Sequence, residues 1–117
     1  MRALALLILI GCCAPSVEAA EVRCGWLSNL TPRNWWLTDK DGNWTLSTQG
    51  SDRQAEGMEL IPDLTEGEFV RTNGSYGYGC ACLTLEVGRG QKRVMRIVAA
   101  RQLWLSQCRA DRSLPKL

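Results

Sequence analysis

The chain has 117 residues and a formal net charge of +2, from 14 Lys and Arg and 12 Asp and Glu residues, and it contains no histidine. This length suits a single small domain. The absence of histidine excludes Ser-His-Asp and Cys-His nucleophilic catalysis, imidazole acid–base chemistry and every metal site with a His ligand.

The first residues have the pattern of an export signal. Arg2 precedes an apolar run, Ala3 to Ile10, and the small-residue stretch ending in Val17-Glu18-Ala19 fits the cleavage rule for signal peptides. We expect residues 1–19 to be removed and residues 20–117 to form one small β domain. The apolar run is shorter than the roughly 18 residues that a membrane-spanning helix needs.

A second processing route starts from the same segment. Leu9-Ile10-Gly11-Cys12 resembles a bacterial lipobox, in which Cys12 is lipidated and becomes the mature N-terminus. That route requires an unusually short leader, so cleavage after Ala19 is the preferred interpretation. Both routes predict an exported protein, periplasmic or associated with the outer membrane. Contact with a membrane is expected only if Cys12 is lipidated.

The first part of the mature chain predicts a hairpin. Residues 23–33 are expected to form an irregular lead-in. Residues 35–38 and 44–48 are predicted strands, because Asp39-Lys40-Asp41-Gly42 between them is a strong turn signal. Trp36 and Trp44 are candidates to pack against each other across this hairpin.

The middle of the chain alternates polar stretches with short apolar ones. Residues 49–57 predict a loop, and residues 58–61 a short strand that ends at Pro62. Residues 69–72 predict another strand. Asn73-Gly74 then gives the strongest two-residue turn signal in the chain.

The clearest strand signal lies in residues 80–87, where apolar residues occupy one face. Residues 93–99 return antiparallel to it after a glycine turn, whereas the last segment, residues 101–117, is compatible with a helix or an extended strap. Glycines alternate with tyrosines over residues 75–79 and indicate a bulge, a bend or close backbone approach. About five short antiparallel strands predict an all-β fold, a small barrel or sandwich. The alternative is an α+β sheet with one C-terminal helix.

Four cysteines remain after the leader: Cys24, Cys80, Cys82 and Cys108. An even number in a short exported chain indicates two disulfides. Cys80 and Cys82 share one face of a strand, at the limit of the distance that a bridge between them tolerates. A bridge between Cys80 and Cys82 is therefore the least expected of the three pairings, and each of the two cysteines is expected to join one end of the chain. Cys24–Cys82 with Cys80–Cys108 is the preferred pairing, and Cys24–Cys80 with Cys82–Cys108 stays open. The spacing does not fit a zinc ribbon, and no metal or cofactor is expected.

Aromatic residues are the candidate ligand-binding groups. The sequence holds five tryptophans, whose ordinary role in a small domain is to fill the core. Trp35 and Trp36 are neighbours in a predicted strand and face opposite sides, so at least one of them is expected outside the core. Trp35, Tyr76 and Tyr78 are the residues predicted to contact a ligand, because the tyrosines alternate with flexible glycines.

Charged residues divide unevenly along the chain. Residues 39–86 hold nine acidic and three basic residues, whereas residues 87–117 hold eight basic residues and Asp111 alone. This asymmetry indicates either a surface for an anionic lipid or polysaccharide, or two halves that neutralise each other in the fold. The acidic residues lie in polar loops and are interpreted as solvated surface rather than catalytic pairs; they are Asp39, Asp41, Asp52, Glu56, Glu59, Asp63, Glu66 and Glu68.

Several blocks resemble one family of small proteobacterial proteins, domain of unknown function 4087. They are Arg23-Cys24-Gly25-Trp26, residues 34–39, residues 72–83 with Tyr-Gly-Cys-Ala-Cys at their centre, and Cys108-Arg109-Ala110-Asp111. The sequence departs from the family at Trp104, where the family tends to carry proline. The resemblance implies export and the four-cysteine framework, and it implies no catalytic or binding residues.

These observations favour a binding module for an envelope glycan or protein over an enzyme. An inhibitor or interaction protein of another envelope protein is the alternative, and a carboxylate-dependent hydrolase is the third possibility. No nucleic-acid partner is expected, and the oligomeric state is open.

Overall fold

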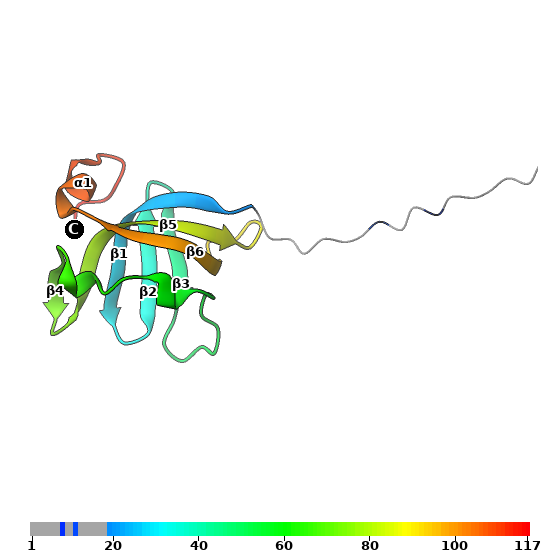
Figure 1. Ribbon diagram of the computed structural model, residues 1–117, viewed down its shortest axis with the longest axis horizontal. Helices are drawn as coiled ribbons and strands as arrows, with labels where there is room; N and C mark the ends of the chain where they lie inside the picture. Colours follow the sequence, from blue (N-terminus) through cyan, green and yellow to red (C-terminus); the bar gives the residue numbers. More distant parts are fainter. Residues whose placement is uncertain (1–7, 9–10, 12–18) are drawn as a thin grey trace, which may run out of the picture.

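The computed structural model describes Ile8, Gly11 and residues 19–117, so both routes of leader processing, including lipidation of Cys12, fall outside the described residues. Within the described part, the chain forms one antiparallel sheet of six strands and a short C-terminal helix (Figure 1). The strands are β1 (Glu21–Thr31), β2 (Asn34–Asp39), β3 (Gly42–Ser47), β4 (Val70–Asn73), β5 (Tyr76–Val87) and β6 (Val94–Leu103); the helix is α1 (Leu105–Ala110). The predicted all-β class is confirmed.

Strand β5 organises the sheet. The order is β3-β2-β1-β5-β4, and β6 also pairs with β5. Figure 1 shows β6 passing across β2 and β3, while β5 stays paired with β1, so that the two halves of the bent sheet face each other. One isolated β-bridge, a backbone pairing between Thr45 and Arg93, places β3 next to the start of β6. The sheet is nevertheless not closed as a barrel, and the architecture is compact and sandwich-like.

Two predicted elements are wrong. Residues 23–33 belong mostly to β1, which pairs with both β2 and β5. Residues 58–61, predicted as a strand, begin with the 3-10 helix Met58–Leu60. That helix follows Gly57, whose φ of 83° turns the chain in a way that favours glycine.

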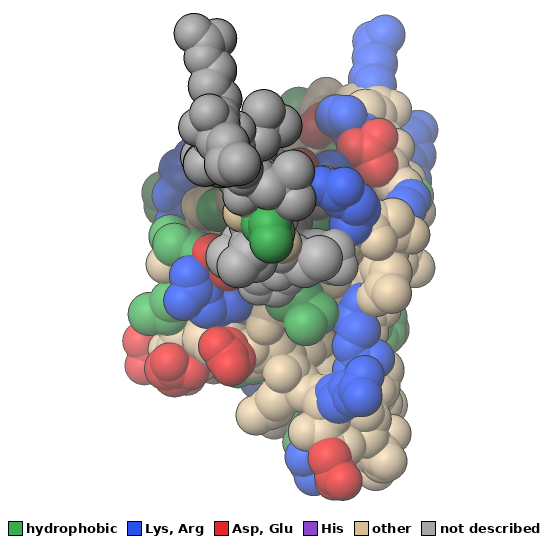
Figure 2. All heavy atoms as spheres, turned by 90° about the vertical axis from the view of Figure 1, so that its right-hand side faces the viewer, with side chains coloured by type: hydrophobic (Ala, Val, Ile, Leu, Met, Phe, Trp, Pro, Cys, Tyr) green, Lys and Arg blue, Asp and Glu red, His purple; other side chains and the backbone are tan. Residues whose placement is uncertain are grey.

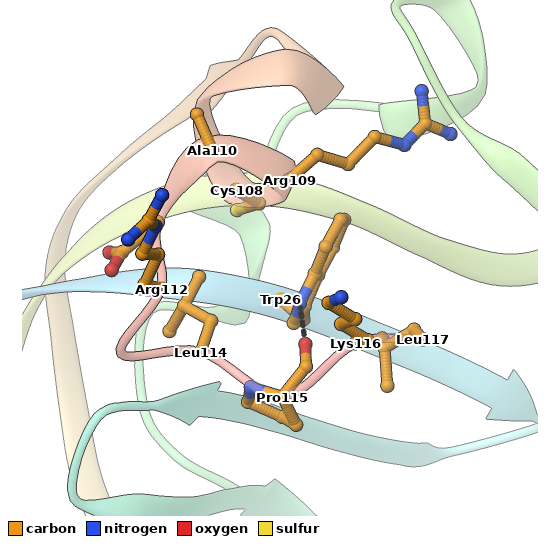
Figure 3. Close-up of a pocket in the computed structure, with 10 residues that line it drawn as sticks. Trp26, Cys108, Arg109, Ala110, Arg112, Leu114, Pro115, Lys116 and Leu117 are labelled. Carbon is orange, nitrogen blue, oxygen red and sulfur yellow. Dashed lines mark hydrogen bonds between the residues drawn. The ribbon is translucent and has the colours of Figure 1, made fainter.

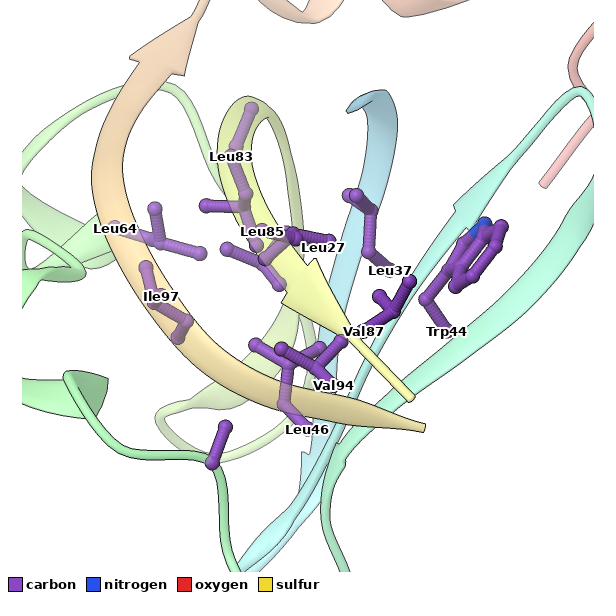
Figure 4. Packing of buried hydrophobic residues seen from close by; sticks show 12 residues of the cluster. Leu27, Leu37, Trp44, Leu46, Leu64, Leu83, Leu85, Val87, Val94 and Ile97 are labelled. Atoms are coloured by element: carbon purple, nitrogen blue, oxygen red, sulfur yellow. The ribbon is translucent and has the colours of Figure 1, made fainter. Parts of the chain in front are cut away.

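The main core lies between the two halves of the bent sheet (Figure 4). It contains the predicted apolar face of β5, and its members are Leu27, Leu37, Trp44, Leu46, Ala55, Leu64, Ala81, Leu83, Leu85, Val87, Val94 and Ile97. In the β2–β3 hairpin Leu37 is opposite Trp44, and Trp36 is opposite Thr45. The predicted contact between Trp36 and Trp44 is therefore wrong, because successive residues of β2 face opposite sides of the sheet.

A second cluster, the C-terminal core, covers the other face of the sheet under α1. Its members are Trp26, Cys80, Leu105, Cys108 and Leu114. The bridges join Cys24 to Cys82 and Cys80 to Cys108, which is the preferred pairing. The second bridge fixes α1 to β5. Disulfides of this kind are consistent with an oxidising compartment.

The last segment resolves into a helix that begins after Trp104. The φ of Trp104 is −65°, a value at which proline is also fixed, so the backbone would accept the proline that the resemblance led us to expect there. The backbone N–H of Trp104 donates to Oε1 of Gln107 at 3.1 Å, a bond that proline cannot make. The side chain contributes little packing, since Trp104 is 67% exposed.

The close approach of the β4 backbone to β5 explains why residue 77 is a glycine. A Cβ atom on Gly77 would overlap the carbonyl oxygen of Val70 on β4, whereas the nearest atom to a Cβ on Gly79 is 3.5 Å away. We expect Gly77→Ala to lower the free energy of unfolding by about 1–3 kcal/mol, because the β4–β5 pair must separate to admit the methyl group. Urea denaturation followed by circular dichroism measures this change.

Gly79→Ala is the matched control, since Gly79 lies on the same face of β5 two residues further on. We expect it to change the free energy of unfolding by less than about 1 kcal/mol. Equal effects of the two substitutions would contradict the close approach of β4 to Gly77.

Candidate functional site

Two of the three predicted ligand-binding residues line one pocket of about 490 Å³. We call it the aromatic pocket; it is lined by Asn29, Trp35, Ile61, Pro62, Asp63, Leu64, Thr65, Phe69, Ser75 and Tyr76. Trp35 and Tyr76 are far apart in sequence and come from β2 and β5. The strand pairings that place β1 between these two elements bring them to the same region.

The floor of the aromatic pocket is continuous with the main core. Trp35, Ile61 and Phe69 are partly buried and pack against that core, so each combines a fixed position with an accessible surface. Trp35 lies two residues before the buried Leu37 and shares its face of β2, which is why Trp35 and not Trp36 reaches the pocket. The pocket thus presents an aromatic and aliphatic surface that packing holds in place.

Polar groups surround this surface. Oδ1 of Asp63 accepts hydrogen bonds from the Thr65 hydroxyl at 2.6 Å and the Thr65 amide at 3.0 Å. These bonds hold the pKa of Asp63 below its ordinary value, so the carboxylate is an ionised acceptor at neutral pH. The amide nitrogen of Asn29 donates to the carbonyls of Thr31 and Asn34, at 2.9 and 3.0 Å, which fixes the orientation of this side chain.

Tyr78 does not line the aromatic pocket. Its ring packs edge-on against Trp26, with ring centroids 5.4 Å apart and planes at 87°. This pair belongs to the C-terminal core and its surroundings. The structure therefore separates Tyr78 from Trp35 and Tyr76, and gives it a packing role that spacing along the sequence did not reveal. Sequence reasoning did not single out Phe69 as a ligand-binding residue, although it placed Phe69 as the first residue of the predicted strand 69–72.

A second pocket, of about 830 Å³, lies between Trp26 and the C-terminal segment (Figure 3). The indole Nε1 of Trp26 donates to the carbonyl of Pro115 at 2.9 Å and holds this segment against the sheet. Arg109, Arg112 and Lys116 line the pocket. Figure 3 shows Arg109 and Arg112 extending to opposite sides, so these cations do not converge on one point.

Charges of opposite sign lie close together elsewhere in the fold. Arg96 of β6 forms an ion pair with Glu86 of β5 at 2.7 Å, which joins the basic and acidic parts of the chain. Figure 2 shows acidic side chains among the basic ones on the face seen there. Within the part of the chain that the structure describes, the Arg96–Glu86 pair is the one ion pair that joins the acidic and basic halves of the chain.

The carboxylates of Asp39 and Asp41 share one arginine. Nη1 of Arg23 donates to Asp39 and to Asp41, each at 2.8 Å, and its guanidinium carbon lies 3.9 Å from the centre of the Trp44 ring. Oδ1 of the buried Asp39 also accepts from the indole of Trp44 at 2.9 Å and from the amide of Asp41 at 2.8 Å. We call these four residues the Arg23 cluster.

The Arg23 cluster is built to hold charges rather than to transfer protons. Burial opposes the charge on Arg23, but hydrogen bonds to Asp39, Asp41 and Glu21 outweigh it and raise the pKa of the guanidinium above its ordinary value. The bond from Arg23, and then that from Lys40, lower the pKa of Asp41. Among residues 19–117 no group of three or more Cys, Asp or Glu side chains is placed to hold a metal ion.

Fold and pockets together define a small disulfide-linked β domain with an aromatic pocket. Residues 18–115 match the model of the family described as "Protein of unknown function (DUF4087)", and the chain belongs to this family. No curated protein and no solved structure matches the chain. In the part of the chain that the structure describes, no helix is long and apolar enough to cross a membrane.

Proposed function

We propose that this protein is an exported binding module of the bacterial envelope that holds a glycan in the aromatic pocket. The observation that carries this proposal is the meeting of Trp35 and Tyr76 in one pocket with Phe69. Aromatic rings offer flat apolar faces, and a sugar ring has an apolar face of the same kind with hydroxyl groups around its edge. The two disulfides suit an oxidising compartment such as the periplasm.

The polar groups of the aromatic pocket fit this ligand class. Ligand pockets usually have volumes of about 300–1,000 Å³ and combine apolar walls with a few fixed polar groups. The ionised Asp63 is a strong acceptor for sugar hydroxyls. Asn29, on β1, adds an amide side chain whose orientation is fixed by its own hydrogen bonds. Envelope glycans, either peptidoglycan fragments or lipopolysaccharide, are therefore the ligands to test.

The test is a titration of intrinsic tryptophan fluorescence with soluble peptidoglycan fragments and with lipopolysaccharide. We expect saturable binding of one of them and a loss of affinity of at least about tenfold for Trp35→Ala, because stacking and its buried apolar contact are lost. Tyr76→Ala is the second variant, since Tyr76 is not part of the main core, and we expect a weaker loss in the same direction.

Trp104→Ala is the matched control for this experiment. Trp104 is 67% exposed and lies outside the aromatic pocket, so removing it changes the fluorescence signal without changing the proposed site. We expect it to bind glycan as the unmodified protein does. Flat titrations with both glycans, or equal affinities of the Trp35→Ala and Trp104→Ala variants, would contradict the proposal.

A further inference from the structure

The two disulfides differ in how far solvent reaches them. Cys80 and Cys108 are 1% and 4% exposed, and both belong to the C-terminal core under α1. Cys24 is an exposed residue of β1, and its partner Cys82 is 5% exposed. Because thiol–disulfide exchange requires a thiolate to reach a sulfur atom, the Cys24 side of the first bridge is the accessible point of attack in the folded protein.

A cation lies beside Cys82, the less exposed cysteine of this bridge. Arg101 of β6 is opposite Cys82 in the strand register, and its Nη2 donates to Sγ of Cys82 at 3.9 Å. Among the described residues Arg101 takes part in none of the ion pairs. A neighbouring arginine stabilises a thiolate, so the position of Arg101 favours Cys82 as the leaving group when Cys24 is attacked.

The space around the bridge allows a reagent to approach. A pocket of about 260 Å³ is lined by all four bridged cysteines together with Arg101 and Asp111. It adjoins both bridges, so the exposure of Cys24 and not this pocket distinguishes the first bridge from the second. Asp111 is the acidic residue among those that line it, and its Oδ1 already accepts from the amide and hydroxyl of Ser113, at 2.9 and 2.6 Å. In the described part of the chain no ion pair joins Arg101 to Asp111.

We propose that Cys24–Cys82 is a site of thiol–disulfide exchange with an external dithiol, such as a dithiol oxidoreductase of the envelope. The donor thiolate attacks Sγ of Cys24, a new S–S bond forms there, and the Cys24–Cys82 bond breaks with its electron pair leaving on Cys82 beside Arg101. The second thiol of the donor then attacks the mixed disulfide. The donor becomes a disulfide, Cys24 leaves as a thiolate, and two electrons and two protons have passed to the protein.

The fold keeps its strand pairing when this bridge opens. Strands β1 and β5 are in register from the pair Glu21–Leu85 to the pair Asn29–Gly77, with Cys24 and Cys82 as directly opposed residues within that ladder. Backbone pairing on both sides of the bridge thus holds the two sulfurs near each other, so the reduced form can close again. This activity is independent of the aromatic pocket, and the two proposals fail or succeed separately.

The test uses the full mature protein, with glutathione and with dithiothreitol as the probes. Samples are reduced for increasing times, the thiols are alkylated, and each cysteine is followed by mass spectrometry of peptides. We expect Cys24 and Cys82 to be alkylated while Cys80 and Cys108 remain bridged. We also expect the glutathione mixed disulfide to form on Cys24, because attack there releases the thiolate beside Arg101.

Arg101→Gln tests the role of the cation, and Arg96→Gln is the matched control. Both arginines lie on β6, but Arg96 pairs with Glu86 rather than with a sulfur. We expect Arg101→Gln to slow reduction of the bridge about tenfold, since a less stabilised leaving thiolate departs more slowly. Arg96→Gln should leave the rate unchanged.

Three results would overturn the proposal. The first is alkylation of all four cysteines together at the rate of global unfolding. The second is a mixed disulfide on Cys82 instead of Cys24. The third is an equal rate of reduction for the Arg101→Gln and Arg96→Gln variants, with both shown by circular dichroism to be folded.

Discussion

Arg23→Gln is expected to lower the free energy of unfolding by about 2–4 kcal/mol, because it leaves the buried carboxylate of Asp39 without its cation. Asp39 is 5% exposed, and Arg23 contacts it at 2.8 Å while covering the ring of Trp44. The substitution removes the charge-assisted bond and the cation–π contact together, and glutamine replaces neither. Urea denaturation followed by circular dichroism measures the loss.

The matched control is again Arg96→Gln, which breaks an ion pair of similar length at the surface. The side chain of Arg96 is 51% exposed, and its pair with Glu86 is screened by water. Such pairs contribute about 0–1 kcal/mol, so the expected effect is small. If Arg23→Gln and Arg96→Gln destabilise the protein equally, the Arg23 cluster is not the buried electrostatic anchor described above.

A double variant can separate the two contributions of Arg23. Asp39→Asn removes the buried negative charge, so in that background Arg23→Gln no longer leaves an unpaired carboxylate. We expect the effect of Arg23→Gln to be smaller in the Asp39→Asn variant than in the unmodified protein. Equal effects in both backgrounds would show that Arg23 stabilises the fold through its other contacts, with Trp44, Asp41 and Glu21, and not through Asp39.

Removal of the buried Cys80–Cys108 disulfide is the second change expected to lower the free energy of unfolding strongly. We expect Cys80→Ala with Cys108→Ala to lower the free energy of unfolding by about 3–4 kcal/mol, from the loop entropy regained by the unfolded chain. The substitution also frees α1, whose remaining attachment to the sheet consists of a few residues around Trp26. Hydrogen exchange of the amides of residues 105–110 should therefore become faster in the native state.

Cys24→Ala with Cys82→Ala is the control for the faster amide exchange of residues 105–110. It also removes a disulfide, but β1 and β5 remain paired along their ladder and α1 keeps its own bridge. We expect amide exchange over residues 105–110 to stay slow in that variant. Fast exchange there in both double variants would mean that α1 is held by the global stability of the domain and not by Cys80–Cys108.

Local sequence signals were sufficient where a turn or an alternating pattern is itself the cause of the structure. Asp39 to Gly42 and Asn73-Gly74 connect the strands that they were expected to connect, with φ of 119° at Gly42 and 60° at Gly74. The alternation over residues 80–87 placed Leu83 and Leu85 in the main core and both cysteines on the other face. Turn geometry and side-chain alternation depend on a few neighbouring residues, so the sequence contains them.

Strand β1 shows what the sequence did not reveal. Residues 23–33 were expected to form an irregular lead-in, yet pairing with β2 on one side and β5 on the other makes β1 a central strand. Gly25 is required there, because a Cβ at this position would overlap the carbonyl oxygen of Thr38. The need for that glycine arises from a strand elsewhere in the sequence, and residue propensity does not record it.

The candidate site also depends on contacts between segments that are distant in the sequence. The sequence by itself determined which aromatic residues were available, and that Trp35 and Trp36 face opposite sides of their strand. Only the tertiary structure decided that Tyr76 joins Trp35 at the aromatic pocket while Tyr78 packs on Trp26. It likewise placed Arg101 beside Cys82, a neighbour set by the register of β5 with β6. Turn residues and alternation help to set the register within a hairpin. Which distant strands pair with each other depends on the packing of the whole sheet, so contacts such as these are decided by the tertiary structure.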